Sequence, residues 1–293
     1  MFCPPIRVFL SGFLLGGVLL VPGLSPGTAA LALGVLFPLL RQIDGLALDR
    51  FNRKAYLLRL LPLLLGVLTG LPLWGKLLWI LLVQYPLAVY GALTGLLAAA
   101  LCRQVGRLTK AVPFSPAVPA AGALALLPPL LLCAGCPDGL LPAGQSPYLT
   151  GVLLFCIGAA SAGVMSLTGG FGTLATGALV PLICGAYESM LRGVGRLDLL
   201  QFLPLLAGAA VGFLFLTRPA RWLRTRFPGW VAGTSLGLTA SGVLLLSRKF
   251  LMHIPGASPV AVILAVFGCL LCLLPGLRTL RKNIHAPLKE VSP

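Results

Sequence analysis

Ten apolar segments, separated by short gaps, constrain this chain more than any other feature of its sequence. They run roughly over residues 8–21, 27–40, 57–75, 85–102, 117–134, 149–165, 170–184, 202–217, 229–246 and 258–275. The chain is 58% hydrophobic and only 10% charged, with a mean hydropathy of +1.01. A soluble domain carries about 25% charged residues to cover its surface. The sequence therefore predicts an all-α, polytopic integral membrane protein.

The net charge of +16, from 22 Lys and Arg against 6 Asp and Glu, would suggest a nucleic-acid partner in a soluble protein. Here the basic residues fall in the gaps between apolar segments, as the positive-inside rule requires, so no nucleic-acid partner is expected. With a cytoplasmic N-terminus, five of the 22 cations lie outside and the other 17 inside, which also predicts a cytoplasmic C-terminus. The five are Lys76, Arg192, Arg196, Arg248 and Lys249.

The chain repeats itself. A displacement of 143 residues places Val21–Leu39 on Val164–Leu182 and pairs Gly34 with Gly177. A displacement of 142 pairs four G-x-x-x-G stretches: Gly66–Gly70 with Gly208–Gly212, and Gly91–Gly95 with Gly233–Gly237. Leu-rich composition does not explain matched glycines, so we expect two related halves, residues 1–147 and 148–293, that together form one transport domain. The G-x-x-x-G stretches are interpreted as helix-packing positions, with a sliding helix pair as the alternative.

Two pairs of segments are too short and too broken to cross a bilayer comfortably, since a spanning helix needs about 20 apolar residues. These pairs, 8–21 with 27–40 and 149–165 with 170–184, are interpreted as re-entrant helical hairpins. Each half then contributes about three transmembrane helices, an odd number, so the second repeat is inverted in the membrane. Inverted repeats with broken helices are typical of secondary transporters.

The breaks themselves suggest an anion site. Each break, at Pro22–Thr28 and Ser166–Phe171, precedes an apolar helix whose first turn has free N–H groups and the positive end of the helix dipole. The candidate phosphate-binding residues are Ser25, Gly27, Thr28, Thr168, Gly169 and Gly170. The alternative is that each break is only a tight turn. Arg41, after the first hairpin, is a further candidate, or only a charge that sets topology.

Other chemistry is not expected. Enzyme motifs are absent from the sequence, and the two histidines and six acids do not form a catalytic pattern. Glu188 is the only acid close to an apolar segment and is expected to pair with Arg192, four residues later. The C-x-x-C pairs Cys133/Cys136 and Cys269/Cys272 are interpreted as packed thiols rather than zinc ligands. We therefore expect no metal and no cofactor.

At these positions the sequence resembles the bacterial polyprenyl-phosphate (undecaprenyl phosphate) transporter family. The resemblance rests on Gly16, Pro22–Thr28 and Gly34, on Leu61–Gly70, and on Tyr85-Pro86 with Gly91–Gly95 and their copies in the second half. Compared with the family pattern, an acid before the first Pro-Gly and a tyrosine soon after Gly34 and Gly177 are missing. Ser25-Pro26-Gly27-Thr28 replaces S-G-G-T, and the second motif has lost its Pro-Gly. The chain is therefore similar to a divergent member.

The resemblance implies a multi-pass protein of the bacterial inner (plasma) membrane. It also implies that the chain returns undecaprenyl phosphate from the outer to the inner leaflet for reuse in cell-envelope glycan synthesis. Its partners would be the polyprenyl-phosphate lipid and the bilayer, while the sequence does not indicate an oligomeric state. A channel or carrier for a small inorganic anion could use the same helix N-termini, and a non-transporting membrane scaffold is a third possibility.

Overall fold

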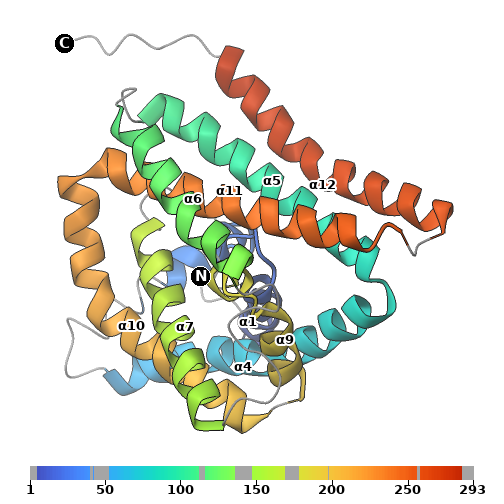
Figure 1. Cartoon of the computed structure of the whole chain (residues 1–293). Helices are drawn as coiled ribbons and strands as arrows, with labels where there is room; N and C mark the ends of the chain where they lie inside the picture. Colours follow the sequence, from blue (N-terminus) through green and yellow to red (C-terminus); the bar gives the residue numbers. More distant parts are fainter. Residues whose placement is uncertain are drawn as a thin grey trace.

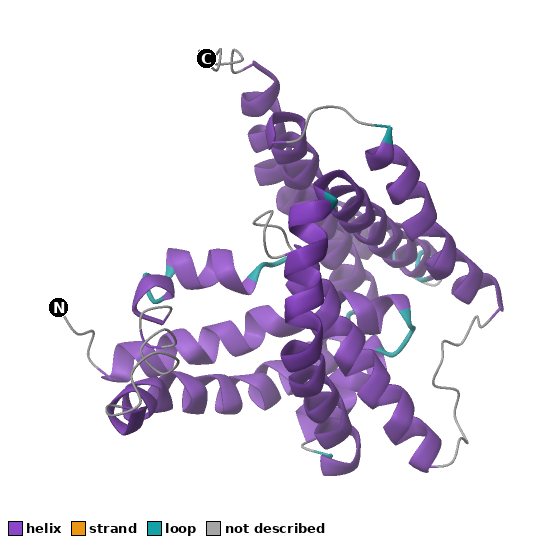
Figure 2. Ribbon diagram, turned by 90° about the vertical axis from the view of Figure 1, so that its left-hand side faces the viewer, coloured by secondary structure: helices purple, strands orange, loops and turns teal. Residues whose placement is uncertain are grey.

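The computed structural model describes residues 5–39, 42, 53–111, 116–135, 147–168, 178–196, 198–255 and 258–285. Every regular element in these residues is a helix (Figures 1 and 2). The all-α prediction is therefore confirmed. The helices are α1 Pro5–Leu20, α2 Pro26–Ala32, α4 Arg53–Gln84, α5 Pro86–Ala111, α6 Ala117–Gly135, α7 Pro147–Thr168, α8 Leu179–Ile183, α9 Tyr187–Arg196, α10 Leu199–Arg226, α11 Pro228–Met252 and α12 Pro259–His285.

Proline determines where many of these helices begin. Six of the eleven described helices have proline as their first residue: Pro5, Pro26, Pro86, Pro147, Pro228 and Pro259. Proline fits this position because the first turn has no partner for its N–H and because its fixed φ already suits a helix. The single-residue breaks at Tyr85 and Phe227 therefore separate α4 from α5 and α10 from α11 without a long loop.

Helices from distant parts of the sequence pack along one another. α1 packs on α4, and α7 packs on α10. α5 packs on both α12 and α11, and α11 also packs on α6. Figure 1 shows α5, α11 and α12 side by side, with α7 and α10 on the other side of the molecule. The helices of the two halves are therefore interleaved through α5 and α11.

All four G-x-x-x-G stretches lie where two helix backbones touch. A methyl group added at Gly66 would clash with the carbonyl oxygen of Phe9 on α1, and one at Gly208 with that of Phe155 on α7. A methyl group added at Gly95 would likewise clash with the carbonyl oxygen of Cys269 on α12. Gly233 approaches α6 in the same way. Their interpretation as helix-packing positions is therefore confirmed.

One polar contact lies inside the α5–α11 crossing. Gln104 on α5 is 1% exposed, and its amide nitrogen donates a hydrogen bond of 2.6 Å to the Ser235 hydroxyl on α11. Its amide oxygen accepts one of 3.0 Å from the Thr239 hydroxyl. A buried glutamine between apolar helices is tolerated because both ends of its amide are satisfied.

Five described helices are long and apolar enough to cross a membrane: α4, α5, α7, α10 and α11. α7 differs from the expectation of a short hairpin arm, because it runs unbroken from Pro147 and its apolar stretch, Tyr148–Leu167, has 20 residues. α1 has only 16 residues, as expected for a hairpin arm. α6 and α12, expected to be crossings, have apolar stretches of 10–17 residues within the described chain.

The largest buried core lies between the two halves. It is built around Leu20 of α1, Tyr90 and Leu97 of α5, Leu179 of α8 and Tyr187 of α9, which come from four different helices. α9 contributes most of one side of this core, although no segment was expected there. Its arginines and Glu188 lower its hydropathy, while its other face buries Tyr187, Met190, Leu191 and Val194.

Candidate functional site

The loop between α1 and α2 holds the first set of predicted site residues. Gly23 has φ +96°, and a methyl group there would lie 3.0 Å from the Cα of Leu97. Glycine is needed for both reasons, because other residues are strained at this φ and would not fit against α5. Leu97 lies near the middle of the Pro86–Gly106 span of α5. The loop is therefore packed against the centre of an apolar crossing helix rather than its end.

Ser25 caps α2. Its hydroxyl oxygen accepts a hydrogen bond of 3.4 Å from the Thr28 N–H, and the Thr28 hydroxyl donates one of 2.9 Å to the Ser25 carbonyl oxygen. The loop is thus an ordinary N-cap, which fits the tight-turn alternative, yet it still has free donors. Among the described residues, the Ser25 hydroxyl hydrogen and the Gly27 N–H have no partner, and both Gly27 and Thr28 are exposed.

The second set of predicted residues is only partly visible. Thr168 is the last residue of α7. Gly169, Gly170 and Arg41 lie outside the described residues. The proposed meeting of the two hairpins therefore stays a prediction.

Gly34 has a structural counterpart in Gly185, which differs from Gly177, the residue with which the displacement by 143 pairs it. After α2, Gly34 has φ +71°, and its N–H bonds the Leu31 carbonyl oxygen at 3.0 Å. After α8, Gly185 has φ +69°, and its N–H bonds the Leu182 carbonyl oxygen at 3.1 Å. Both are glycine C-caps of the same kind. They are 151 residues apart (185 − 34), whereas the alignment by 143 pairs Gly34 with Gly177.

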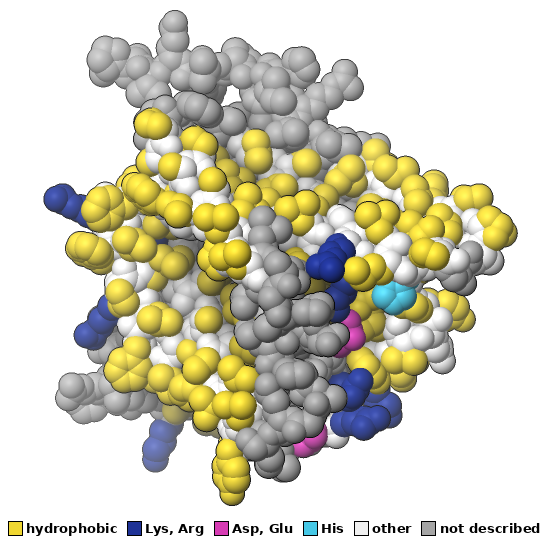
Figure 3. Space-filling model, in the orientation of Figure 1, with side chains coloured by type: hydrophobic (Ala, Val, Ile, Leu, Met, Phe, Trp, Pro, Cys, Tyr) yellow, Lys and Arg dark blue, Asp and Glu magenta, His cyan; other side chains and the backbone are white. Residues whose placement is uncertain are grey.

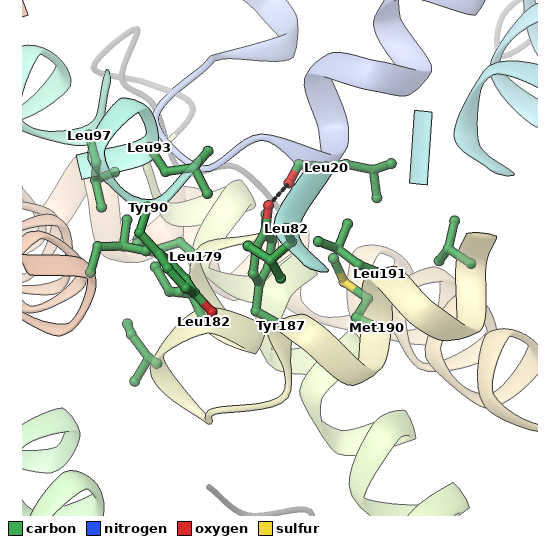
Figure 4. Close-up of a cluster of buried hydrophobic side chains, with 14 residues drawn as sticks. Leu20, Leu82, Tyr90, Leu93, Leu97, Leu179, Leu182, Tyr187, Met190 and Leu191 are labelled. Carbon is green, nitrogen blue, oxygen red and sulfur yellow. Dashed lines mark hydrogen bonds between the residues drawn. The ribbon is translucent and has the colours of Figure 1, made fainter. Parts of the chain in front are cut away.

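With the spacing of 151 residues, the second half contains the tyrosine that the family pattern places soon after the glycine. Tyr187 follows the second glycine cap by two residues, so a tyrosine does come soon after a hairpin glycine in the second half. Its hydroxyl donates a hydrogen bond of 3.0 Å to the carbonyl oxygen of Leu20 at the end of α1 (Figure 4). The same register places Thr176 opposite Ser25 (25 + 151), a position outside the described residues.

A second polar site lies where α5, α9 and α11 meet. The Glu188 carboxylate accepts a 2.6 Å hydrogen bond from the Tyr90 hydroxyl and forms an ion pair with the Lys249 ammonium group. The expected partner, Arg192, instead lies over the Trp79 ring, 4.6 Å from its centroid. The prediction of a Glu188–Arg192 pair was wrong because Lys249 approaches from another helix, which a rule for spacing within one helix does not consider.

The pair lines a hollow of about 280 Å³. Its polar lining is Tyr90, Glu188, Lys249 and His253, and its other residues are Trp79, Leu82, Val83, Pro86 and Met252. Burial disfavours the charged carboxylate, but the hydrogen bonds from Lys249 and Tyr90 outweigh it and hold the pKa of Glu188 below its ordinary value. Glu188 is therefore an anion whose charge Lys249 neutralises.

Sequence reasoning missed this hollow as a site. It singled out Glu188 but not Tyr90 or Lys249, which are 98 and 61 residues away from it in the chain. The available signal was the small set of cations expected outside, because Lys249 and Arg192 both belong to it.

As for metals, the described residues contain no group of three or more His, Cys, Asp or Glu able to hold one, and Cys269 and Cys272 lie on α12 as free thiols.

A family model described as undecaprenyl phosphate translocase-like (VCA0040-like) matches residues 15–249. The matched region includes the Ser25–Thr28 loop, the four G-x-x-x-G stretches, and Tyr90, Glu188 and Lys249 of the second polar site, and the match confirms the resemblance found in the sequence. Comparison with curated proteins and with solved structures gave no match.

Proposed function

This chain belongs to the undecaprenyl phosphate translocase-like family, and from that premise we propose that it moves a polyprenyl monophosphate, undecaprenyl phosphate, from the outer to the inner leaflet. One observation carries the proposal beyond family membership. Gly23 is packed against Leu97 at the centre of α5, so the donor-bearing loop lies at depth between crossing helices. A lipid headgroup that changes leaflets must pass this depth.

The architecture that we propose is two inverted repeats with six crossings and two re-entrant hairpins. The helix pairs support it. α1 on α4 corresponds to α7 on α10, and α5 on α12 corresponds to α11 on α6. Such reciprocal pairing is what a duplicated unit produces when its copies are related by a two-fold axis. The matched glycine caps after α2 and α8 support the same relationship between the hairpins.

In the proposed mechanism, the loop holds the phosphate through donors alone. The Ser25 hydroxyl and the Gly27 N–H bind one side of it, with the α2 dipole adding positive potential. The Thr28 N–H and hydroxyl, which bond Ser25 in the structure, would exchange those bonds for the phosphate. Thr168, Gly169 and Gly170 supply the second side, with Thr176 as their alternative in the register of the glycine caps. Arg41 would meet the phosphate at the membrane surface. The prenyl tail stays in the lipid, so only the headgroup loses its water.

The runner-up is a channel or carrier for a small inorganic anion, which could use the same donors. Exposed apolar side chains that follow the loop in the chain, Leu31 in the last turn of α2 at 51% and Phe37 after Gly34 at 69%, favour a lipid instead. A closed aqueous path has no use for apolar side chains at its mouth, whereas a prenyl chain does. A scaffold without transport would have no need of free donors at this depth.

Binding of undecaprenyl phosphate to the purified protein, measured by native mass spectrometry against phosphatidylglycerol, tests the proposal. The double variants Ser25→Ala/Thr168→Ala and Ser25→Ala/Thr176→Ala should both lower selective binding of undecaprenyl phosphate. The double variant that binds this lipid more weakly shows whether Thr168 (displacement 143) or Thr176 (displacement 151) is the counterpart of Ser25. Ser258→Ala is the matched control, because Ser258 caps α12 before Pro259 just as Ser25 caps α2 before Pro26. Equal binding of both lipids by every variant would contradict the proposed phosphate site at the loop and would favour transport of an inorganic anion.

A further inference from the structure

We propose that the hollow beside Glu188 and Lys249 is a second phosphate site, which receives the phosphate monoester headgroup of a lipid at the membrane surface before or after it passes the Ser25–Thr28 loop. The identity of the lipid rests on the proposed function. The phosphate chemistry rests on the hollow itself.

The hollow lies at the ends of helices rather than at their centres. Val83 and Pro86 stand at the junction of α4 and α5, and Met252 is the last residue of α11. This places the hollow near one surface of the membrane, far along α5 from Leu97. Its rim is apolar and open, since Val83 is 61% and Met252 59% exposed. A polar floor below an apolar rim suits a headgroup whose hydrocarbon tail remains in the bilayer.

Cations gather around this hollow although the topology disfavours them there. Lys249 lines it, and Arg192 lies over its Trp79 wall. The Gly75–Lys76 backbone touches Gly195 farther along the contact between α4 and α9, so Lys76 and Arg196 lie on the same pair of helices but outside the hollow lining. Figure 3 shows Lys and Arg side chains above and below an acidic side chain, with a histidine beside them. Cations are depleted on the outer side of membrane proteins, so this gathering indicates a ligand that is an anion.

Within the protein, the carboxylate of Glu188 is the anion that pairs with Lys249 in this hollow. The pair is only partly shielded, with side-chain exposures of 40% for Glu188 and 38% for Lys249, so it can exchange partners. An arriving phosphate would take the ammonium group of Lys249, while the Tyr90 hydroxyl, now on Glu188 at 2.6 Å, is a second donor within the same wall. His253 donates its Nδ1–H to the Lys249 carbonyl oxygen at 2.7 Å, so Nε2 of the neutral ring is an acceptor and would pair only with a protonated phosphate oxygen.

The size of the hollow limits what it can hold. Pockets that enclose a whole small ligand measure about 300–1,000 Å³, and this one measures about 280 Å³. It therefore accepts a headgroup and not a complete lipid. The exposed apolar side chains of the rim, Val83 and Met252, suit the first carbons of the chain.

The test uses two substitutions that should change the affinity for undecaprenyl phosphate in opposite directions. Glu188→Gln removes the competing anion but keeps an acceptor for Tyr90, so undecaprenyl phosphate should bind several-fold more tightly. Lys249→Gln removes the cation and should weaken binding about tenfold, the scale of a charged hydrogen bond. Arg248→Gln is the matched control: it loses the same charge one residue away, outside the hollow lining, and should bind like wild type. Binding is titrated by native mass spectrometry, with thermal unfolding of each variant in detergent measured alongside.

Inorganic phosphate serves as a separate arm, because a free anion could use the same contacts. Lipid binding that follows the opposite signs, with inorganic phosphate binding at least a hundredfold more weakly, supports a lipid headgroup site. If the two variants change the affinity for inorganic phosphate in opposite directions but the protein binds no undecaprenyl phosphate, the phosphate site stands, whereas the lipid ligand and the proposed function are overturned. Glu188→Gln and Lys249→Gln that weaken both probes alike, or change neither, would overturn the second site and show the pair to be only structural. The Ser25 variants report on the loop independently.

Discussion

Tyr187 donates a hydrogen bond of 3.0 Å to the backbone carbonyl oxygen of Leu20, although 167 residues separate them. Both residues are almost fully buried, at 2% and 3% exposure. The bond joins the last residue of α1 to the first residue of α9. It satisfies a carbonyl that a helix end leaves without a partner. The end of α1 is therefore held against the start of α9, 167 residues later in the chain.

Tyr187→Phe should lower stability by about 1–3 kcal/mol, because a buried carbonyl oxygen is left without its donor while the ring still fills its space. The measurement is the midpoint of thermal unfolding in detergent. Tyr148→Phe provides the control, since Tyr148 is 85% exposed. Equal midpoints for the two variants would contradict the role given to the Tyr187 hydroxyl.

Gly66→Ala should destabilise the protein by about 1–3 kcal/mol, the usual cost of overpacking. The added methyl group has to displace the α1 backbone at Phe9. Gly268→Ala is a matched control, because Gly268 is also inside a helix and has nothing within 4 Å of the added methyl group. Since alanine is a better helix former than glycine by about 1 kcal/mol, the control should be neutral or stabilising in the same unfolding assay.

Gln104→Leu should loosen the α5–α11 crossing, because it removes two bonds to the Ser235 and Thr239 hydroxyls. Polar contacts between membrane helices contribute about 0.6 kcal/mol on average and about 1.7 at most. We therefore expect a loss of about 1–3 kcal/mol, with faster hydrogen exchange of α11 amides near Ser235. Unchanged exchange there would show that the apolar packing alone holds the crossing.

Acid should weaken the contact of Glu188 with α5 and α11. Its pKa is lowered in the folded protein, so its contribution to stability is complete above its ordinary value near 4.5 and is lost as the pH falls through the lower folded value. The unfolding midpoint of wild type should therefore exceed that of Glu188→Gln most at neutral pH and approach it below about pH 4. A difference that stays constant from pH 7 to pH 3 would refute this.

Much of the fold could be predicted from glycine and proline. Proline at a first helical position marked six helix starts, and the paired glycines identified close helix contacts before their partners were known. The partners themselves could not be predicted. Gly95 meets Cys269 on a helix of the other half, and no local pattern specifies which of several apolar helices that will be. α9 was missed because its charged residues hide it from a search for apolar segments.

The candidate sites show the same division. The Ser25–Thr28 loop was found because Ser-Pro before an apolar run is a local signal, and Ser25 is indeed a helix cap. The partner of Glu188 was missed because it depends on how α11 lies against α9, which only the packed structure decides. The displacement by 143 and the spacing of the glycine caps differ by eight residues (151 − 143), and leucine identities are too frequent to decide between the two registers.

The interleaving of α5, α6, α11 and α12 has a consequence for biosynthesis. The ribosome completes α5 long before α12, yet the close-packed Gly91–Gly95 surface of α5 needs Ala265 and Cys269 on α12 as its covering. During insertion, this face of α5 must rest against lipid or an insertion factor until almost the last helix arrives. A chain that stalls before α12 would thus expose a ready-made helix-docking groove to the membrane's quality-control proteases.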